Sequence, residues 1–506
     1  MLIIKKTFRW FIYVILAILA LMIITAAIIR FAVFPNINHY KSDIAATITE
    51  KIGLKTTVGN IVTGWDGLSP KVLIRQIDIY DKENQPALHL ENVNGTFSWL
   101  SIPMMRPHLS YLDVKNPKLI VHRKENGSIY IAGIPMAGEG EPDFANWLLS
   151  QANINIKNAA IVWQDDLRKA PALSLDKVNF NLKNSAWRKI FGQHFFSLMA
   201  LPSTGTTSPI IINGHFFGRD VSNIETWHGE LNLNTNEIDL TAWKAWFDYP
   251  IDLQSGAGKT IVSLTFSDKK IDKLKADVSL NNLSIRSSTS KALLNAKLLA
   301  GLLTWEKTQK ATTITGQNIK LDAENNFHIN NGSGFVSRSI KNNEPWVNAS
   351  LKLDTFDLSY LSQLQKVIQL PTQVSQPLKA LNPQGRLSDI NIRLQGNPEN
   401  PSHYAIESTF ESLSMNPYLN IPGFNNLSGE VEANEDSGTL QLSSSNAYVN
   451  IKDVLRWPIP LTTLNGKVSW HKNKGKLKIV ANDITLANPH LSGTLNASYD
   501  MNGAKG

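Results

Sequence analysis

The chain of 506 residues contains no cysteine. Disulfide bonds, a cysteine nucleophile and a cysteine-ligated zinc site are therefore excluded. A chain without thiols suits an oxidising compartment, although it fits other compartments too. Apolar residues make up 42% and charged residues 18% of the sequence, which is a globular balance for a length of two to four domains.

The sequence also lacks the short motifs of catalytic and metal sites. Its eleven histidines are dispersed, without a His-Glu-x-x-His. Gly256 to Thr260 ends in Gly-Lys-Thr like a phosphate-binding loop, but that motif needs a glycine where this chain has Leu253. We interpret the segment as a β-turn. The adjacent Asp165 and Asp166 would face opposite sides of a strand, so they make a poor acid/base couple. We expect no enzyme, metal or cofactor.

The net charge of +8 is not gathered into a nucleic-acid-binding patch. Lysines and arginines are scattered along the chain, and their only cluster lies near the N-terminus. A solvated surface therefore explains the charge better than a nucleic acid partner does.

One long uncharged run, Phe11 to Ile29, organises the sequence. As a helix its nineteen residues would be about 28 Å long, close to the hydrocarbon thickness of a bilayer. Basic residues precede it at Lys5, Lys6 and Arg9, which predicts a cytoplasmic N-terminus. We predict a cytoplasmic segment over 1–9 and a transmembrane helix over 10–34, with the anchor residues Phe11, Leu16, Leu21 and Ile29. A cleaved signal peptide is the alternative, but its apolar region is usually shorter.

The rest of the chain, 35–506, then lies across the membrane. Tyr40, Ile44, Ile48 and Ile52 recur at helical spacing before Gly53, which predicts a short amphipathic helix. Two further helices are expected, one beginning at Asp143 and one carrying Leu358, Leu361, Leu364 and Ile368. The prolines within 371–385 predict a break between a β-rich region over 35–370 and further β-modules over 386–506.

Most of the remaining sequence alternates between apolar and polar residues, with runs of four to eight residues bounded by Gly, Asn, Asp or Pro. This pattern predicts antiparallel strands with one buried and one solvated face. The runs include Leu88/Leu90, Val93/Phe97/Trp99, Val262/Leu264/Phe266, Val278/Leu280, Ile319/Leu321, Ile390/Ile392/Leu394, Leu440/Leu442, Val449/Ile451, Leu477/Ile479, Ile484/Leu486 and Leu491/Leu495.

A spaced motif recurs in three of these runs: Val93-Gly95-Phe97-Trp99, Leu299-Gly301-Leu303-Trp305 and Leu464-Gly466-Val468-Trp470. Asn318 to Leu321 and Asp483 to Leu486 follow the second and third copies. We interpret the motif as a hairpin unit whose glycine sits on the inner face, where bulk would crowd a neighbour or a bulge is needed. Asn502-Gly503 is a turn signal, so the chain is expected to stop before a return strand, as a truncated portion would.

Several segments resemble the AsmA-like family. They are Gly64 to Pro70, Ile77 to Ile79, Phe97 to Ser101, Leu119 to Arg123 and Asn126 to Ser128. Arg456 to Leu461, running into the third copy of the motif, is similar to the YhdP branch in particular. The resemblance covers essentially the whole chain, and its motifs are structural. Members of this branch are much longer than 506 residues.

The resemblance implies an inner-membrane-anchored periplasmic bridge that carries phospholipid toward the outer membrane without catalysis. Its fold would be mainly β: an elongated, curved, incompletely closed antiparallel sheet with an apolar groove. Membrane proteins at the ends of the bridge are expected partners. The groove candidates are Phe97, Val262, Leu264, Phe266, Val278, Leu280, Ile390, Ile392, Val468, Leu477 and Ile479.

Two other functions fit the same sequence. A membrane-anchored periplasmic scaffold for outer-membrane assembly would have the same strands around a filled core. An envelope enzyme or glycan-binding protein would need a polar, titratable cluster in a pocket. Alternation alone does not separate a filled core from an open groove.

Overall fold

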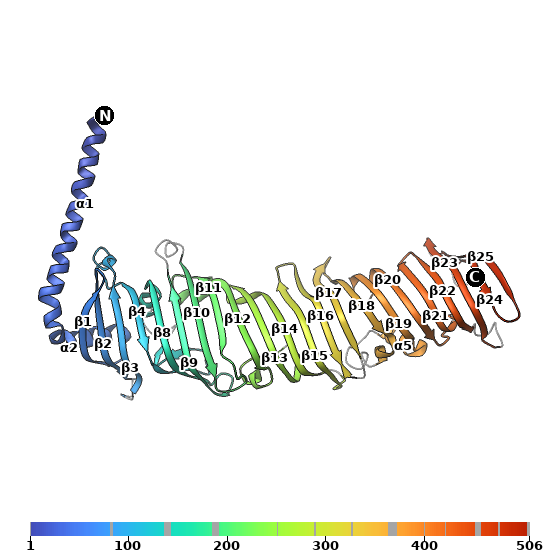
Figure 1. Cartoon of the computed structure of the whole chain (residues 1–506), viewed down its shortest axis with the longest axis horizontal. Helices are drawn as coiled ribbons and strands as arrows, with labels where there is room; N and C mark the ends of the chain where they lie inside the picture. Colours follow the sequence, from blue (N-terminus) through green and yellow to red (C-terminus); the bar gives the residue numbers. More distant parts are fainter. Residues whose placement is uncertain are drawn as a thin grey trace. The chain divides into compact units, whose positions relative to one another are not determined.

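The computed structural model describes residues 2–502 except 81–83, 85, 136–142, 185–191, 250, 288–289, 325–326, 363–371, 399, 420, 451–456 and 474–475. The chain is mainly β, with one long N-terminal apolar helix and a large curved sheet that does not close into a barrel (Figure 1). These features of the predicted fold are confirmed. The chain divides into two compact units, which we describe separately: Met1–Thr235 with Thr265–Lys270, and Asn236–Leu264 with Ile271–Gly506.

The first unit begins with α1 (Leu2–Ile28), which continues through the π-helical turn η1 (Ile29–Val33) and the 3₁₀ helix η2 (Phe34–Tyr40). By length and composition, this is the one helix in the described part of the chain that could cross a membrane, and its most apolar window is not buried at all. The predicted amphipathic helix is α2 (Lys41–Ile52). It ends at Gly53, whose φ of +76° suits glycine and whose N–H donates to the Thr49 carbonyl.

The strands of the first unit form a mostly antiparallel arrangement in which β4 and β5 each run parallel to β8. They are β1 (Thr56–Asp66), β2 (Ser69–Tyr80), β3 (Pro86–Phe97), β4 (Leu109–Lys115), β5 (Lys118–Arg123), β6 (Ile129–Ile131), β7 (Ile134–Pro135), β8 (Asn153–Asp165), β9 (Ala170–Lys183), β10 (Gln193–Pro202), β11 (Ile210–Phe217) and the part of β12 (His228–Asp239) up to Thr235. One face of this unit is apolar. The predicted helix at Asp143 is present as α3 (Asp143–Leu149), and its Trp147 and Leu148 pack against that face.

In the second unit, each strand from β15 to β24 pairs antiparallel with its two neighbours in sequence. The strands of this unit are β13 (Asp252–Ser267) up to Leu264, β14 (Lys270–Arg286) from Ile271, β15 (Leu293–Lys307), β16 (Ala311–Ala323), β17 (His328–Lys341), β18 (Glu344–Asp357), β19 (Gln384–Asn397), β20 (Asn400–Met415), β21 (Gly423–Asn434), β22 (Ser437–Asn450), β23 (Ile459–Asn473), β24 (Lys476–Ala487) and β25 (Ser492–Asn502).

Many long strands of both units contain one non-glycine residue with a positive φ in mid-strand. These residues are Gln76, Asn158, Lys177, Asn282, Asn318, Asp389, Ser412, Asn426, Asn446 and Asp483. Register shifts accompany many of them, as at Asn318 and Asp483, so they mark β-bulges. A bulge bends its strand and adds one residue to it. Apolar side chains three residues apart, such as Leu280 and Leu283, therefore reach the same buried cluster.

Side chains replace backbone hydrogen bonds around the bulges. The Ser412 N–H donates to Ser428 Oγ at 3.1 Å, and the Ser428 N–H donates to Ser444 Oγ at 2.9 Å. The Asn426 N–H donates to Ser414 Oγ at 3.1 Å. Because a buried backbone group without a partner is unfavourable, these serines stabilise the line along which the strands bend.

The bulges also explain two copies of the spaced motif. Gly301 and Gly466 have φ of +143° and +141°, and each lies at a register shift. A Cβ on Gly466 would meet Ile484 Cα at 2.7 Å and the Asp483 carbonyl oxygen at 2.8 Å. The prediction of a glycine needed at a bulge is confirmed for these copies. Gly95 has no positive φ and no register shift, so the first copy differs.

One prediction from the sequence is contradicted, and others fall partly outside the described residues. The β-turn predicted over Gly256 to Thr260 is wrong, because these residues lie inside β13. A Cβ on Gly258 would come within 2.0 Å of the Ser279 carbonyl oxygen, so glycine is needed here for a close approach to β14. Of the helix predicted from Leu358, the structure has η8 (Leu358–Tyr360), while Leu364 and Ile368 lie outside the described residues. The segment 371–385 includes α5 (Thr372–Leu381), and Gly503 is also outside the described residues.

We predict that Gly466→Ala lowers the free energy of unfolding by about 1–3 kcal/mol, because alanine is strained at this φ and contacts the facing strand. Hydrogen exchange at β23 and β24 measures the effect locally. Gly493→Ala is the matched control, since a Cβ there has no atom within 4 Å. Equal protection in the two variants would contradict the bulge interpretation.

Candidate functional site

The second unit presents a continuous apolar face. Residues opposite each other in paired strands share a side of the sheet, so the register shows which side chains lie in one row. One row runs from β14 to β25 without a charged residue: Ala276, Leu303, Gly316, Gly334, Leu351, Ile392, Ile406, Ala433, Gly438, Trp470, Ile479 and Tyr499. The adjacent row, from β14 to β20, is Leu274, Trp305, Ile314, Val336, Ala349, Leu394 and Tyr404.

Part of this face is open to solvent. The exposed fractions are 37% for Leu303, 55% for Ile314, 42% for Val336, 41% for Leu351 and 48% for Tyr404. These residues come from five strands and lie in the two adjacent rows, so they form one patch, which we call the open wall. A packed core would bury such side chains almost completely. Contiguous exposed apolar surface is typical of a binding site.

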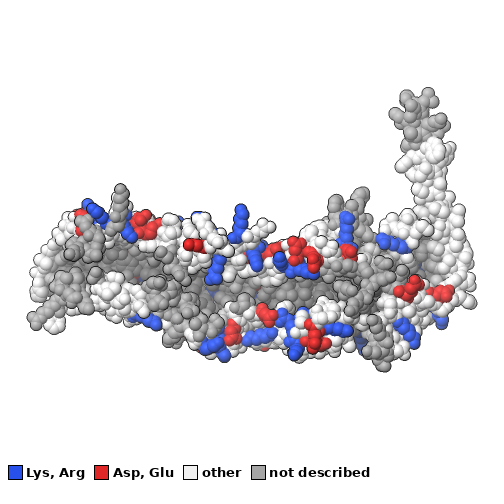
Figure 2. Space-filling view, turned by 180° about the vertical axis from the view of Figure 1, so that it is seen from behind, with Lys and Arg blue, Asp and Glu red and all other residues white. Residues whose placement is uncertain are grey.

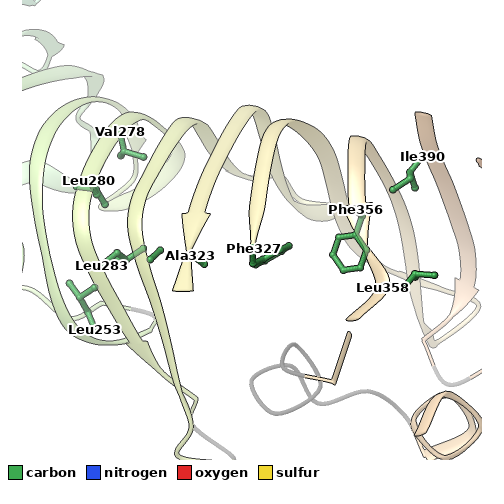
Figure 3. Packing of buried hydrophobic residues seen from close by; sticks show 10 residues of the cluster. Leu253, Val278, Leu280, Leu283, Ala323, Phe327, Phe356, Leu358 and Ile390 are labelled. Atoms are coloured by element: carbon green, nitrogen blue, oxygen red, sulfur yellow. The ribbon is translucent and has the colours of Figure 1, made fainter. Parts of the chain in front are cut away.

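The same face is closed on the other side of the bulges. There Leu253, Leu283, Phe327, Phe356 and Leu358 are buried and pack together (Figure 3). The Phe327 ring lies 5.7 Å from that of Phe356, edge to face, and 4.9 Å from that of Tyr360. We call this cluster the floor. The face is therefore a groove with a packed floor and an open wall.

Charged residues avoid the groove. In Figure 2, on the half of the protein away from α1, most of the blue and red atoms lie along the two margins of a hollow. The opposite face of the same strands is mostly polar: Thr315, Ser350 and Arg393 lie there, one residue along from Ile314, Leu351 and Leu394, although Phe335 shares this face. An apolar molecule in the groove would therefore contact apolar atoms, with charged groups within reach at its margins.

The polar face has a shallow hollow of its own, with a volume of about 1160 Å³. Its lining includes Lys352, Arg393, Glu407, His403 and Glu435. Arg393 and Glu407 form an ion pair at 2.8 Å, and both side chains are largely exposed. Paired, solvated charges of this kind carry little energy and resemble an ordinary protein surface more than an acid/base site.

Glu435 connects this polar face to the open wall. Its Oε1 lies 2.6 Å from His403 Nδ1, and its Oε2 accepts from the Tyr404 N–H at 3.1 Å. The hydrogen bond with His403, followed by backbone hydrogen bonds, lowers the pKa of Glu435 from 4.5 to about 2. The hydrogen bonds of the ionised Glu435 therefore stabilise the folded chain above pH 4.5, and this stabilisation is lost as the pH falls toward about 2.

The structure places the sequence-derived groove candidates as follows. Val278, Leu280 and Ile390 are buried in the floor cluster, and Ile392 packs against it. Ile479 lies in the row described above, and Val468 and Leu477 share the apolar side of β23 and β24. Val262, Leu264 and Phe266 alternate along β13 and are half-buried. Phe97 belongs to the core of the first unit.

Sequence reasoning missed most of the open wall. Ile314, Val336, Leu351 and Tyr404 were not candidates, although each occupies an alternating apolar position in its strand. These positions could have been found from their pairing across neighbouring strands. A single sequence does not show which strands pair. Among the described residues, no three His, Asp or Glu side chains gather where they could hold a metal ion.

We predict that Phe327→Ala, in the floor, lowers the free energy of unfolding by about 3–5 kcal/mol, as expected for a buried aromatic side chain. Val336→Ala, in the open wall, should change it by less than about 1 kcal/mol, because Val336 is already exposed. Denaturant unfolding of the detergent-solubilised chain, followed by tryptophan fluorescence, compares the two. Similar losses would mean that the wall is packed like the floor.

Searches of curated proteins and of solved structures found no match. A family model described as YhdP protein matches residues 1–506, the whole sequence. The chain, with its N-terminal apolar helix and its curved, open β-sheet, belongs to the YhdP family.

Proposed function

We propose that this chain is a membrane-anchored segment of a bridge that carries phospholipid between the inner and outer membranes of a bacterial envelope. Membership of the YhdP family is consistent with this role. The observation that carries the proposal is the open wall, whose apolar side chains stay exposed although they lie in paired rows on one side of the strands. The groove would hold acyl chains, and the proposal includes no catalytic step.

The energetics favour such a groove. A two-chain phospholipid has about 30 CH₂ groups, and exposing each to water costs about 0.8 kcal/mol, so free transfer would cost on the order of 25 kcal/mol. An uninterrupted apolar row across many strands keeps this surface out of water at each step. The headgroup needs no specific pocket, because it can remain in water at the charged margins seen in Figure 2.

The helix α1 is the anchor of the chain in this proposal. In this proposal α1 spans the inner membrane with its N-terminus in the cytoplasm, and the strands lie in the periplasm. The three basic residues before the apolar run support that orientation. Proteins of either membrane could contact the ends of the bridge.

The second candidate is a periplasmic scaffold with a filled core. The packing of α3 in the first unit favours it, since Trp147 and Leu148 occupy the apolar face there. The open wall of the second unit favours lipid. The two functions differ in whether acyl chains contact the wall.

Photo-crosslinking tests this difference. A benzoylphenylalanine residue at Leu303, Val336 or Leu351 should form adducts with labelled phospholipid in cells. The polar-face neighbours Thr304, Ser337 and Ser350 serve as matched controls and should form none. If the exported, folded protein gave no adducts at the wall positions, the scaffold would be the better account.

We predict that Val336→Asp slows phospholipid transfer. A carboxylate in the path would oppose the passage of acyl chains by more than about 1.4 kcal/mol, or about tenfold in rate. Ser337→Asp, on the polar face, is the control and should leave the rate unchanged. Delivery of labelled phospholipid to the outer membrane measures both variants. Equal rates in the two variants would argue against transport along this wall.

Topology has a separate test. Alkaline phosphatase fused after Leu100 should be active, because the enzyme needs the oxidising periplasm to form its disulfides. β-Galactosidase, which works in the cytoplasm, should be inactive when fused at the same position. An inactive phosphatase fusion together with an active β-galactosidase fusion would reverse the orientation and rule out both the bridge and the scaffold.

A further inference from the structure

Two loops of the first unit expose large apolar side chains. The turn between β1 and β2 exposes Leu68 by 85%. The loop between β3 and β4 exposes Leu100 by 51% and Met105 by 93%, together with Ile102 and Met104. Such a density of exposed apolar side chains on two loops is unusual for a surface that faces only water.

The two loops lie at the same end of the sheet. β2 and β3 are antiparallel, with Lys71 opposite Thr96, so the residues before β2 and after β3 are neighbours. The Thr96 hydroxyl donates to Asp66 Oδ2 at 3.4 Å and joins the ends of β3 and β1, from which the two loops leave. The exposed apolar side chains therefore belong to one surface, which we call the loop patch.

The helix α1 leaves the sheet at this end. Asn38 of η2 exchanges hydrogen bonds with the backbone of Ile61 at 3.0 and 3.1 Å, and the Phe34 ring lies 5.7 Å from that of Trp65. These contacts show that η2 and β1 run in opposite directions: Asn38 contacts Ile61, and Phe34, which is nearer to α1, contacts Trp65. β1 therefore runs back toward α1. Its end, at Asp66, is thus level with the last residues of the apolar helix. Figure 1 shows α1 projecting beyond this end of β1–β4.

The longer loop is held in a fixed shape. Ser101 Oγ donates to the His108 carbonyl at 3.0 Å and accepts from the His108 N–H at 2.9 Å, which closes the base of the loop. Within it, the Met104 and Met105 N–H groups donate to the Leu100 and Ile102 carbonyls at 3.1 Å. Such internal bonds are what backbone near a membrane needs, since lipid offers it no partners.

We propose that the loop patch docks into the surface of the membrane that α1 crosses, so that the sheet is held to the bilayer at a second place. This inference rests on the proposed function, because it requires α1 to span the membrane. The occupant is the interfacial region of the bilayer. Arg106 is exposed in the longer loop, and Arg30 is exposed in η1, four residues before Phe34. Both suit anionic headgroups, while Asp66, exposed at the end of β1, carries the opposite charge. Docking would place the start of the sheet directly on its lipid source.

The absence of cysteine makes the test direct. The full-length variants Leu68→Cys and Met105→Cys are labelled with the polarity-sensitive dye NBD and reconstituted in phosphatidylethanolamine and phosphatidylglycerol vesicles. Leu167→Cys is the matched control: Leu167 is 49% exposed in the turn after β8, which runs parallel to β4 and so ends at the opposite end of the sheet. Leu16→Cys reports on the anchor itself.

At positions 68 and 105 we expect NBD emission to shift to shorter wavelength, iodide quenching to fall and lipid-borne nitroxides near the headgroup to quench. At position 167 the dye should behave as in water. Iodide quenching at 68 and 105 equal to that at 167, with the dye at position 16 inside the bilayer, would overturn the docking proposal alone. Iodide quenching at position 16 as well would overturn the anchor and the proposed function with it.

Discussion

Apolar and polar residues alternate along a strand whose apolar side chains all lie on one face. Where such a strand bends sharply at a bulge, this alternation must be interrupted. Here the interruption is a residue with positive φ at a bulge, followed by an apolar residue, in strands of both units. The extra residue changes the spacing from two to three and bends the strand at the same point. In the second unit, the floor, the open wall and the apolar rows all depend on these bulges.

The bend separates two kinds of apolar surface. On one side, buried side chains such as Phe327 and Phe356 supply the packing that stabilises the sheet. On the other side, Ile314 and Val336 remain exposed although the sequence is free to place polar residues there. Exposed apolar surface contributes nothing to folding, so its extent is best explained by something that covers it. In the proposed function, that is lipid.

Sequence patterns predicted much of this fold. The run from Phe11 to Ile29, the helical spacing up to Ile52 and the alternation of the later segments correspond to α1, α2 and the strands. The glycine motif indicated bulges at Gly301 and Gly466. The open wall could not be predicted, because exposure depends on which strands are neighbours and how far they bend. The prediction of a β-turn over Gly256 to Thr260 was wrong for a related reason. Glycine there permits a close approach to β14, and the segment forms no turn. The loop patch likewise depends on the contact of Asn38 with Ile61.

The central claim is that acyl chains occupy the groove beside the open wall. Its most direct measurement is electron spin echo modulation from a nitroxide at a single cysteine replacing Val336, in protein loaded with acyl-chain-deuterated phospholipid in ordinary water. Our account predicts deuterium modulation at position 336 and none from a nitroxide at 337, on the polar face. Absence of modulation at 336, with strong modulation once the buffer is changed to D₂O, would show a wall that faces water and would contradict the account.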